Sequence, residues 1–389
     1  MNDDRRIIES LRAGIPSRLA GAVLSSARRP LIDKIENDEG RGRIITGKYG
    51  EGKTHLLNTV AAMAEKKNMV VSLLPLSKET PFHSLAVLFR KIMESTYLPG
   101  SVQPGFAMEI DRISSESDKA RDMLLFADTA LETNRLYFVF KALLNSRDSD
   151  DHFLLLSDLA GDLMPMALLK DIYLRHCHEK LKMNTPFRKT QHCFDYFRFI
   201  SHLFKVLGYD GWYILFDEAE LIGRFGKNSR MKAYANMDLF LSEQKHFDNV
   251  YTMFAFTSSF NEEVLVGKGD YEALKLIDNS EPMKKPIRNA MNMIMNATEL
   301  KSLSRNELED LVGSIVGIYE KAFSWKCPIP SSEVFRRCVN IGFLLRTKVR
   351  AAIEILDELY LFKNVNADIS ATEIVQVEEP SLEDLFSDE

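Results

Sequence analysis

The sequence of 389 residues predicts an α/β fold, with a parallel sheet flanked by helices and an all-helical part after it. Short apolar runs typical of buried strands alternate with amphipathic helical segments up to about residue 298. Residues 299–362 show helical apolar spacing throughout, apart from a proline-containing loop at 327–330. We therefore expect an α/β domain over 39–298 and a smaller helical domain over 299–363.

Composition restricts the class of protein. Apolar residues make up 45% and charged residues 27% of the chain, as in ordinary globular proteins. No apolar run approaches the roughly 18 residues that a membrane span needs, and the N-terminus lacks a secretory signal. Four widely spaced cysteines suggest reduced thiols and no disulfide framework. These features predict a cytoplasmic protein without membrane contact.

The net charge of −6 is unevenly distributed along the chain. The segment 368–389 holds eight acidic residues and no Lys or Arg, so the remaining chain is mildly basic. A mildly basic body permits contact with duplex DNA but does not require it. The last residues, 364–389, are too polar and acidic to form a core, and we expect a flexible acidic tail there.

Residues 47–54 read GKYGEGKT and fit G-x-x-x-x-G-K-[ST], the phosphate-binding P-loop. A strand-like run at 43–46 precedes the motif and a helical pattern at 55–66 follows it, which favours a P-loop over a glycine-rich turn that binds nothing. In such a loop the backbone wraps the phosphates, the lysine reaches the β/γ-phosphates and the hydroxyl ligates Mg²⁺. The residues expected to bind nucleotide here are Gly47, Tyr49, Gly50, Glu51, Gly52, Lys53, Thr54 and His55.

A second motif follows another apolar run. Residues 212–220 read WYILFDEAE, which predicts a buried strand ending in two carboxylates, the Walker B arrangement. Asp217 would hold Mg²⁺ together with Thr54, and Glu218 would polarise the attacking water. With Lys53, these acids are the expected catalytic residues. The alternative is a strand that ends in a solvated acidic turn.

Three further sets of residues are candidates for contact with the nucleotide. Thr257 and Ser258 end the strand-like run at 251–259 and would face the γ-phosphate or the water, although both residue types are ordinary strand terminators. Arg346 and Arg350 lie four residues apart on one helical face, where the alternative is a solvated basic surface. Residues 224–232, RFGKNSRMK, are expected as a basic loop that faces solvent or DNA phosphates, with an arginine finger as the other interpretation.

Four segments together resemble one known family. They are RRIIESLRAGIPSR, GKYGEGKTHLL, VVSLLPLSKETPFHS and GYDGWYILFDEAE, in this order. The sequence resembles the ATP-binding proteins of BREX-type anti-phage systems, in particular the BrxD-like proteins, over most of residues 5–360. The resemblance implies an AAA+-like P-loop ATPase related to the origin-recognition group, with ATP and Mg²⁺ as cofactors and other defence-system proteins as partners. By position it implies phosphate and Mg²⁺ binding by Lys53 and Thr54, a Walker B pair at Asp217 and Glu218, and a lid sensor at Arg346 or Arg350.

The sequence departs from the origin-recognition pattern in two ways. The long separation between Lys53 and Asp217 leaves room for a helical insertion at about 100–205. No winged-helix domain is expected after the lid, which puts direct duplex binding through such a domain in doubt. The insertion is the alternative place for a contact with DNA or with a partner protein.

We therefore expect N-terminal helices over 1–38 that pack near the nucleotide, an ATPase domain over 39–298 with the insertion, a helical lid over 299–363 and the acidic tail. The leading functional hypothesis is an ATP-driven switch in bacterial antiviral defence, coupled to DNA and capable of ATP-dependent homo-oligomerisation. The second is a signalling or scaffold NTPase that assembles protein partners without touching nucleic acid. Only the first predicts salt-sensitive binding to DNA.

Overall fold

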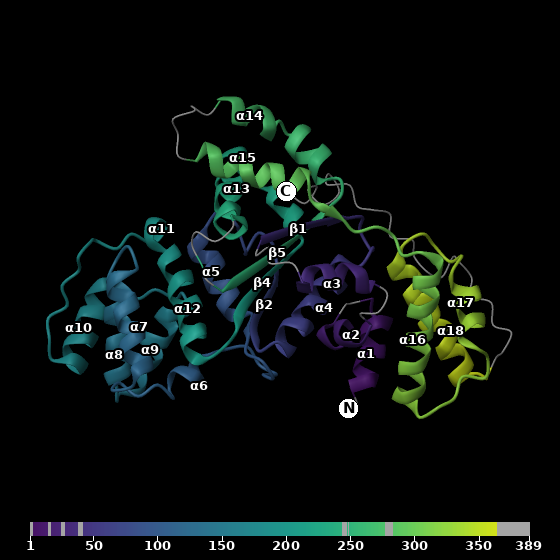
Figure 1. Ribbon diagram of the computed structural model, residues 1–389, viewed down its shortest axis with the longest axis horizontal. Coiled ribbons are helices and arrows are strands. Elements are labelled where there is room, and N and C mark those ends of the chain that lie inside the picture. Colours follow the sequence, from purple (N-terminus) through teal and green to yellow (C-terminus); the bar gives the residue numbers. More distant parts are fainter. Residues whose placement is uncertain are drawn as a thin grey trace.

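The computed structural model describes residues 3–14, 17–24, 28–37, 42–242, 247, 249–276 and 283–363, and the expected acidic tail lies outside them. A six-stranded sheet with strand order β3-β2-β4-β5-β1-β6 forms the centre of the molecule (Figure 1). The strands are β1 (Gly42–Gly47), β2 (Met69–Pro75), β3 (Thr96–Tyr97), β4 (Gly211–Asp217), β5 (Val250–Thr257) and β6 (Thr298–Glu299).

The sheet is parallel except for β3, which pairs antiparallel with β2, so the predicted α/β fold with a parallel sheet is confirmed. The register brings the carboxyl ends of the central strands level: Pro75 pairs with Asp217, and Gly47 pairs with Thr257. Strand β4 is buried along its whole length, as an apolar run between two parallel neighbours requires. The two-residue strands β3 and β6 were not predicted, because they are too short to show a periodic pattern.

Two layers of helices cover the sheet. Successive strand residues face opposite sides, so Ile45, Tyr213 and Leu215 join one core, while Ile44, Ile214 and Phe216 join the other. The first face is covered by α3 (Arg29–Asn37) and α4 (Lys53–Lys66). The second face is covered by α5 (Leu85–Glu94), α12 (Phe194–Leu207), α13 (Lys227–Leu241) and α15 (Lys284–Met295), and α14 (Asp270–Leu276) packs on α15.

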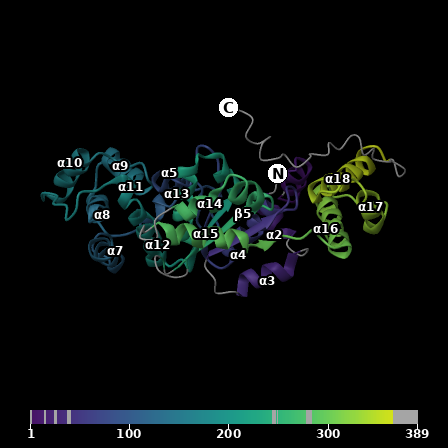
Figure 2. The same cartoon turned by 90° about the horizontal axis from the view of Figure 1, so that it is seen from above.

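A helical bundle stands between β3 and β4 in the sequence. It contains α6 (Ala107–Ile110), α7 (Asp118–Thr129), α8 (Arg135–Asn145), α9 (Ser149–Leu159), α10 (Met166–Cys177) and α11 (Lys189–His192), and it continues into α12. Helices α7 to α10 lie at one end of the elongated molecule, opposite the C-terminal helices (Figures 1 and 2). Among the described residues, no helix has the length and apolar character needed to cross a membrane.

The C-terminal helices have a core of their own. They are α16 (Arg305–Phe323), α17 (Ser331–Cys338) and α18 (Leu345–Leu361). Helix α1 (Asp3–Arg12) contributes Ile7, Ile8 and Leu11 to this core, while α2 (Arg18–Val23) packs against α4. Arg12 fixes the arrangement by donating to both carboxylate oxygens of Asp357, at 2.9 and 2.6 Å. The N-terminal helices therefore join the sheet domain to the C-terminal helices.

The segment 224–232 differs from expectation. Helix α13 begins at Lys227, and Arg230 is only 6% exposed, with Nε and Nη2 donating to Asp270 at 2.8 and 2.5 Å. Tyr234 also donates to Asp270, at 2.8 Å. The prediction of a basic loop facing solvent or DNA is wrong for Arg230, because its charge neutralises a fully buried carboxylate on another helix.

Candidate nucleotide-binding site

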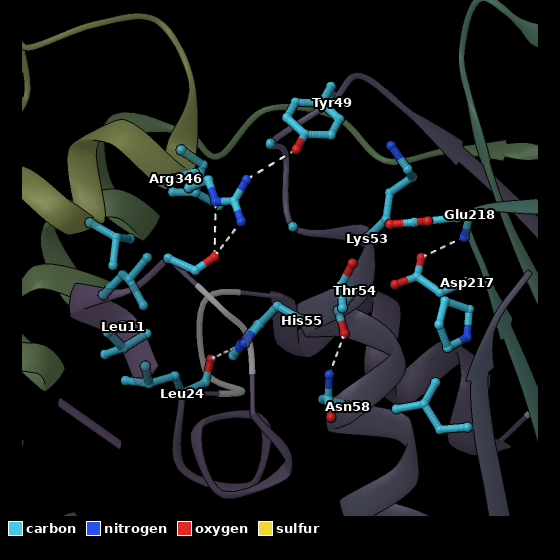
Figure 3. Close-up of a pocket in the computed structure, with 18 of the residues that line it drawn as sticks. Leu11, Leu24, Tyr49, Lys53, Thr54, His55, Asn58, Asp217, Glu218 and Arg346 are labelled. Carbon is cyan, nitrogen blue, oxygen red and sulfur yellow. Dashed lines mark hydrogen bonds between the residues drawn. The ribbon is translucent and has the colours of Figure 1, made fainter. Parts of the chain in front are cut away.

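A cavity of about 580 Å³ lies where the P-loop, the carboxyl ends of β2 and β4, the N-terminal helices and the C-terminal helices meet (Figure 3). Its volume falls in the range of small-molecule sites. Its polar wall includes Tyr49, Gly50, Gly52, Lys53, Thr54, His55, Asn58, Asp217, Glu218, Glu220 and Arg346. Its apolar wall includes Leu11, Leu24, Leu311, Leu345 and Val349, which come from widely separated parts of the chain.

Glycines shape the loop between β1 and α4. Gly50 and Gly52 have φ of 76° and 92°, in the left-handed region that side chains disfavour. A Cβ on Gly50 would also lie 3.3 Å from Leu344 at the start of α18. Gly52 is the N-cap of α4 and supplies no side-chain cap, so the first N–H groups of that helix have no side-chain acceptor at the cap. An open helix N-terminus beside a cavity is suited to a phosphate group.

Lys53 is the first residue of α4 and is 8% exposed. Its Nζ donates to the carbonyl oxygens of Gly47 at 2.8 Å and Lys48 at 3.1 Å. The ammonium group therefore lies within the P-loop, at the wall of the cavity.

Thr54 and Asp217 lie together at the floor of the cavity. Burial raises the pKa of Asp217, while the hydrogen bond from the Thr54 hydroxyl opposes this effect. Asp217 Oδ1 also accepts from the backbone N–H of Glu218 at 3.0 Å. A hydroxyl beside a buried carboxylate is the oxygen donor pair that holds Mg²⁺ in P-loop proteins, so these residues fit a magnesium ion.

Glu218 follows the end of β4 and lies exposed at the cavity, on the same side as Lys53 (Figure 3). Its backbone φ is 52°, a conformation that is uncommon for residues other than glycine and that is concentrated at functional sites. Partial desolvation and the neighbouring charge of Asp217 raise the pKa of Glu218. The structure thus brings both predicted Walker B carboxylates to the cavity.

Thr257 and Ser258 lie beside the P-loop strand but do not line the cavity. Thr257 pairs in register with Gly47, and the N–H of Ser258 donates to the Gly47 carbonyl at 3.2 Å. Gly47 itself packs under Leu300, which would be 3.1 Å from a Cβ at this position. Thr257, Ser258 and Leu300 therefore support the start of the loop from the sheet side.

The two candidate arginines of α18 differ. Arg346 lines the cavity, where Nη1 donates to the Tyr49 hydroxyl at 3.1 Å and Nε and Nη2 donate to the Gly14 carbonyl at 2.9 and 2.6 Å. Arg350 does not line it. Arg346 therefore connects the P-loop, the C-terminal end of α1 and helix α18.

The side chains of Glu51 and His55 each contact a distant part of the chain. Glu51 accepts from the Ser302 hydroxyl at 3.0 Å, so its carboxylate is directed toward the chain after β6. His55 lines the cavity wall, with Nε2 3.2 Å from the Leu24 carbonyl, and burial lowers its pKa. The backbone of Glu51 is also engaged, since its N–H donates to the Lys48 carbonyl at 3.3 Å and its carbonyl accepts from Arg28 at 2.8 Å.

Glu220 is a cavity residue that sequence reasoning missed. It lies in the short 3-10 helix η2 (Ala219–Arg224), is 6% exposed and lines the cavity. Among the described residues its Oε2 has no hydrogen-bond partner, and burial raises the pKa of Glu220 to about 7. The available signal was the third acid of the sequence DEAE, which resembles an ordinary helix start.

Comparison with known proteins gives a family match. The chain matches the family described as BREX system ATP-binding protein BrxC/D over residues 2–110 and 177–372, and the stretch between the matched segments holds α7 to α9 and nearly all of α10. No curated protein matches the sequence. The solved structure of the Walker-type ATPase PABY2304 of Pyrococcus abyssi is similar at 14% identity and a TM-score of 0.35, covering 85% of this chain and 66% of that chain. This chain therefore spans less than two thirds of that structure's length. Because the family match extends over most of the residues, the protein belongs to the BREX system ATP-binding protein BrxC/D family.

Proposed function

We propose that this protein binds Mg²⁺·ATP and hydrolyses it as an AAA+-like switch in a BREX anti-phage system, with its nucleotide cycle coupled to DNA. The observation that carries the proposal is the meeting of three elements at one cavity: the P-loop, the two acids after β4, and Arg346 of α18. Membership of a family of ATP-binding proteins supports the identity of the ligand.

The residues around the cavity suit distinct tasks. The N-terminus of α4 and Lys53 bind the β- and γ-phosphates, and Thr54 and Asp217 hold Mg²⁺. The ion supplies charge neutralisation for the transferring phosphoryl group when it is bound. Glu218 orients and polarises the attacking water, while Thr257 and Ser258 support the loop. The apolar wall suits the face of a nucleotide base, because aromatic bases favour apolar surroundings.

The C-terminal helices, over 299–363, are proposed as a lid on an ATPase domain over 39–298. Arg346 supports this role, because it contacts the P-loop residue Tyr49 from α18 and also contacts Gly14. A phosphate in the cavity would compete for this guanidinium and alter the position of the helices. The expected boundary at 298/299 falls within β6, and the N–H of Leu300 still donates to Thr46, at 2.7 Å. We therefore propose that the hinge follows Leu300.

Other BREX proteins are the proposed partners, as family membership implies, and the bundle within 100–205 is the proposed place for contact with DNA or with a partner. We also propose that the protein forms homo-oligomers when it binds ATP and that it is located in the cytoplasm. A scaffold NTPase that never contacts nucleic acid is the second candidate. It is favoured by one observation: Arg230, within the basic segment expected to face DNA, is buried against Asp270.

The test compares ATP binding and hydrolysis by the wild type, Lys53→Ala and Glu218→Gln, with Lys66→Ala as a matched control. Lys66 lies at the other end of α4 and is exposed, so its removal takes away the same charge far from the cavity. We expect Lys53→Ala to lose ATP binding, Glu218→Gln to bind without turnover, and Lys66→Ala to match the wild type. Unchanged binding and turnover in Lys53→Ala would refute the assignment of the site.

Duplex DNA at low and high salt separates the two candidate functions. Stimulation of hydrolysis that weakens as salt rises supports coupling to DNA, because phosphate contacts release counterions. Hydrolysis that depends on Lys53 and Glu218 but does not respond to DNA supports the scaffold.

A further inference from the structure

Glu220 is a buried acid in the wall of the nucleotide cavity for which the mechanism above has no task. It lies on η2, two residues after Glu218. Ala219 and Ile222 of the same turn are fully or almost fully buried in the main core, so the backbone that carries Glu220 is held by packing. The side chain itself is 6% exposed and forms part of the cavity lining.

The surroundings of Glu220 are unfavourable for an isolated carboxylate. Its Oε2 has no hydrogen-bond partner among the described residues, and the acids Asp217 and Glu218 lie nearby, with Lys53 as the opposing cation. An ionised carboxylate that is buried without a partner is strongly unfavourable. Burial raises the pKa of Glu220 to about 7, so this carboxyl binds a proton more readily than a solvated carboxylate does. The fold keeps this acid although an apolar residue would pack at lower cost.

The expected ligands of the cavity explain why an acid occupies position 220. A magnesium ion in a P-loop site keeps several of its waters, and each water carries O–H donors that need acceptors. Asp217 already accepts from the backbone N–H of Glu218. Glu220 lines the same wall, and its Oε2 is buried there as an acceptor that has no donor among the described residues.

We propose that Glu220 accepts a hydrogen bond from a water ordered beside the bound Mg²⁺ and phosphates, and so acts as a positioning residue for hydrolysis. This inference rests on the proposed function. It predicts opposite effects on two properties: removing the acid leaves the free protein as stable or makes it more stable, but weakens the contribution of Mg²⁺ to nucleotide binding.

Two variants test the inference. Glu220→Gln keeps the shape and one acceptor oxygen, and Glu220→Met removes both oxygens while keeping the length. Glu116→Gln and Glu116→Met, at an exposed position between α6 and α7, are the matched controls. For each protein we would measure the melting temperature without ligand, the Kd for ATP in EDTA, the Kd for ATP with Mg²⁺, and kcat and KM.

We expect Glu220→Met to melt at or above the wild-type temperature and to bind ATP normally in EDTA. Its affinity for ATP with Mg²⁺ and its kcat should fall about 10- to 100-fold, as when an outer-shell partner of a metal site is removed. Glu220→Gln should show a smaller loss, and the Glu116 variants none. A Glu220→Met protein that melts lower and keeps wild-type Mg²⁺ dependence would overturn the inference, since Glu220 would then be structural. So would a variant with all properties unchanged.

A different experimental result would refute the proposed function. A wild-type protein that does not bind ATP under any condition refutes the nucleotide site itself. A wild-type protein that binds Mg²⁺·ATP but does not hydrolyse it without a partner still tests Glu220, through the melting temperature and the two dissociation constants.

Discussion

Two buried carboxylates, one in the helical bundle and one in the cavity, differ in what surrounds them. Asp158 of α9 is fully buried and accepts from Arg135, from the Tyr196 hydroxyl at 2.6 Å and from the N–H of Met164 at 2.8 Å. Glu220 is almost as buried, but one of its oxygens has no partner among the described residues. A buried acid with all partners in place is part of the core, whereas one left unpaired at a cavity wall is available to a ligand.

The largest expected effect comes from breaking the buried ion pair between Arg135 and Asp158 in the helical bundle. Arg135 is 1% exposed, so Arg135→Met would leave Asp158 buried without its cation. We expect a loss of about 3–5 kcal/mol in the free energy of unfolding, measured by urea denaturation. Replacing both residues, as Arg135→Met with Asp158→Leu, should recover much of this loss. A single variant within about 1 kcal/mol of the wild type would show that the pair is not needed in the core.

The next effect concerns the pH dependence of stability at Glu220. The folded protein binds this proton more tightly than the unfolded chain, since the pKa rises from 4.5 to about 7. Stability is therefore expected to fall as pH rises from about 4.5 to about 7, by roughly 3 kcal/mol in total. Glu220→Gln should lack this contribution, so the difference between variant and wild type in unfolding free energy should grow between pH 5 and pH 7. Parallel curves over this range would contradict the raised pKa.

A matched pair of glycines separates backbone strain from function. Gly52 in the P-loop and Gly208 at the end of α12 have φ of 92° and 99°. A Cβ on Gly52 would meet no heavy atom closer than 3.5 Å, and a Cβ on Gly208 would meet none within 4 Å. Changing either residue to Ala should cost about 1–2 kcal/mol in unfolding free energy, because the left-handed region is unfavourable for a side chain. Only Gly52→Ala should also weaken ATP binding, as measured by calorimetry. Equal loss of binding in Gly208→Ala would show that the effect is a general loss of fold.

The smallest effect compares two helix N-termini. Helix α16 is closed by a capping box, in which Ser304 accepts from the N–H of Glu307 and Glu307 accepts from the N–H of Ser304. Helix α4 has Gly52 at its N-cap and no side-chain cap. Ser304→Ala should lower the unfolding free energy by about 1 kcal/mol without changing the Kd for ATP. A changed Kd would indicate that the start of α16 takes part in nucleotide binding.

The sequence determined the features that depend on neighbouring residues. The glycine spacing before Lys53 requires a loop between a strand and a helix, and the apolar run before Asp217 requires a buried strand. Because parallel strands of one sheet end at the same edge, these two motifs had to meet once the sheet formed. The family resemblance rested on the same short segments, and for this reason it was visible before the fold was known.

Only the tertiary structure decided what distant residues do. It brought Arg346, and not Arg350, to the cavity, because α1 and the P-loop pack against one side of α18. It buried Arg230 against Asp270, 40 residues further along the chain. It also left Glu220 buried without a partner for one oxygen, a property of the assembled wall that no local pattern encodes. The burial of a side chain and the partners of its polar atoms depend on contacts between residues far apart in the chain. The local sequence around one residue therefore cannot specify them.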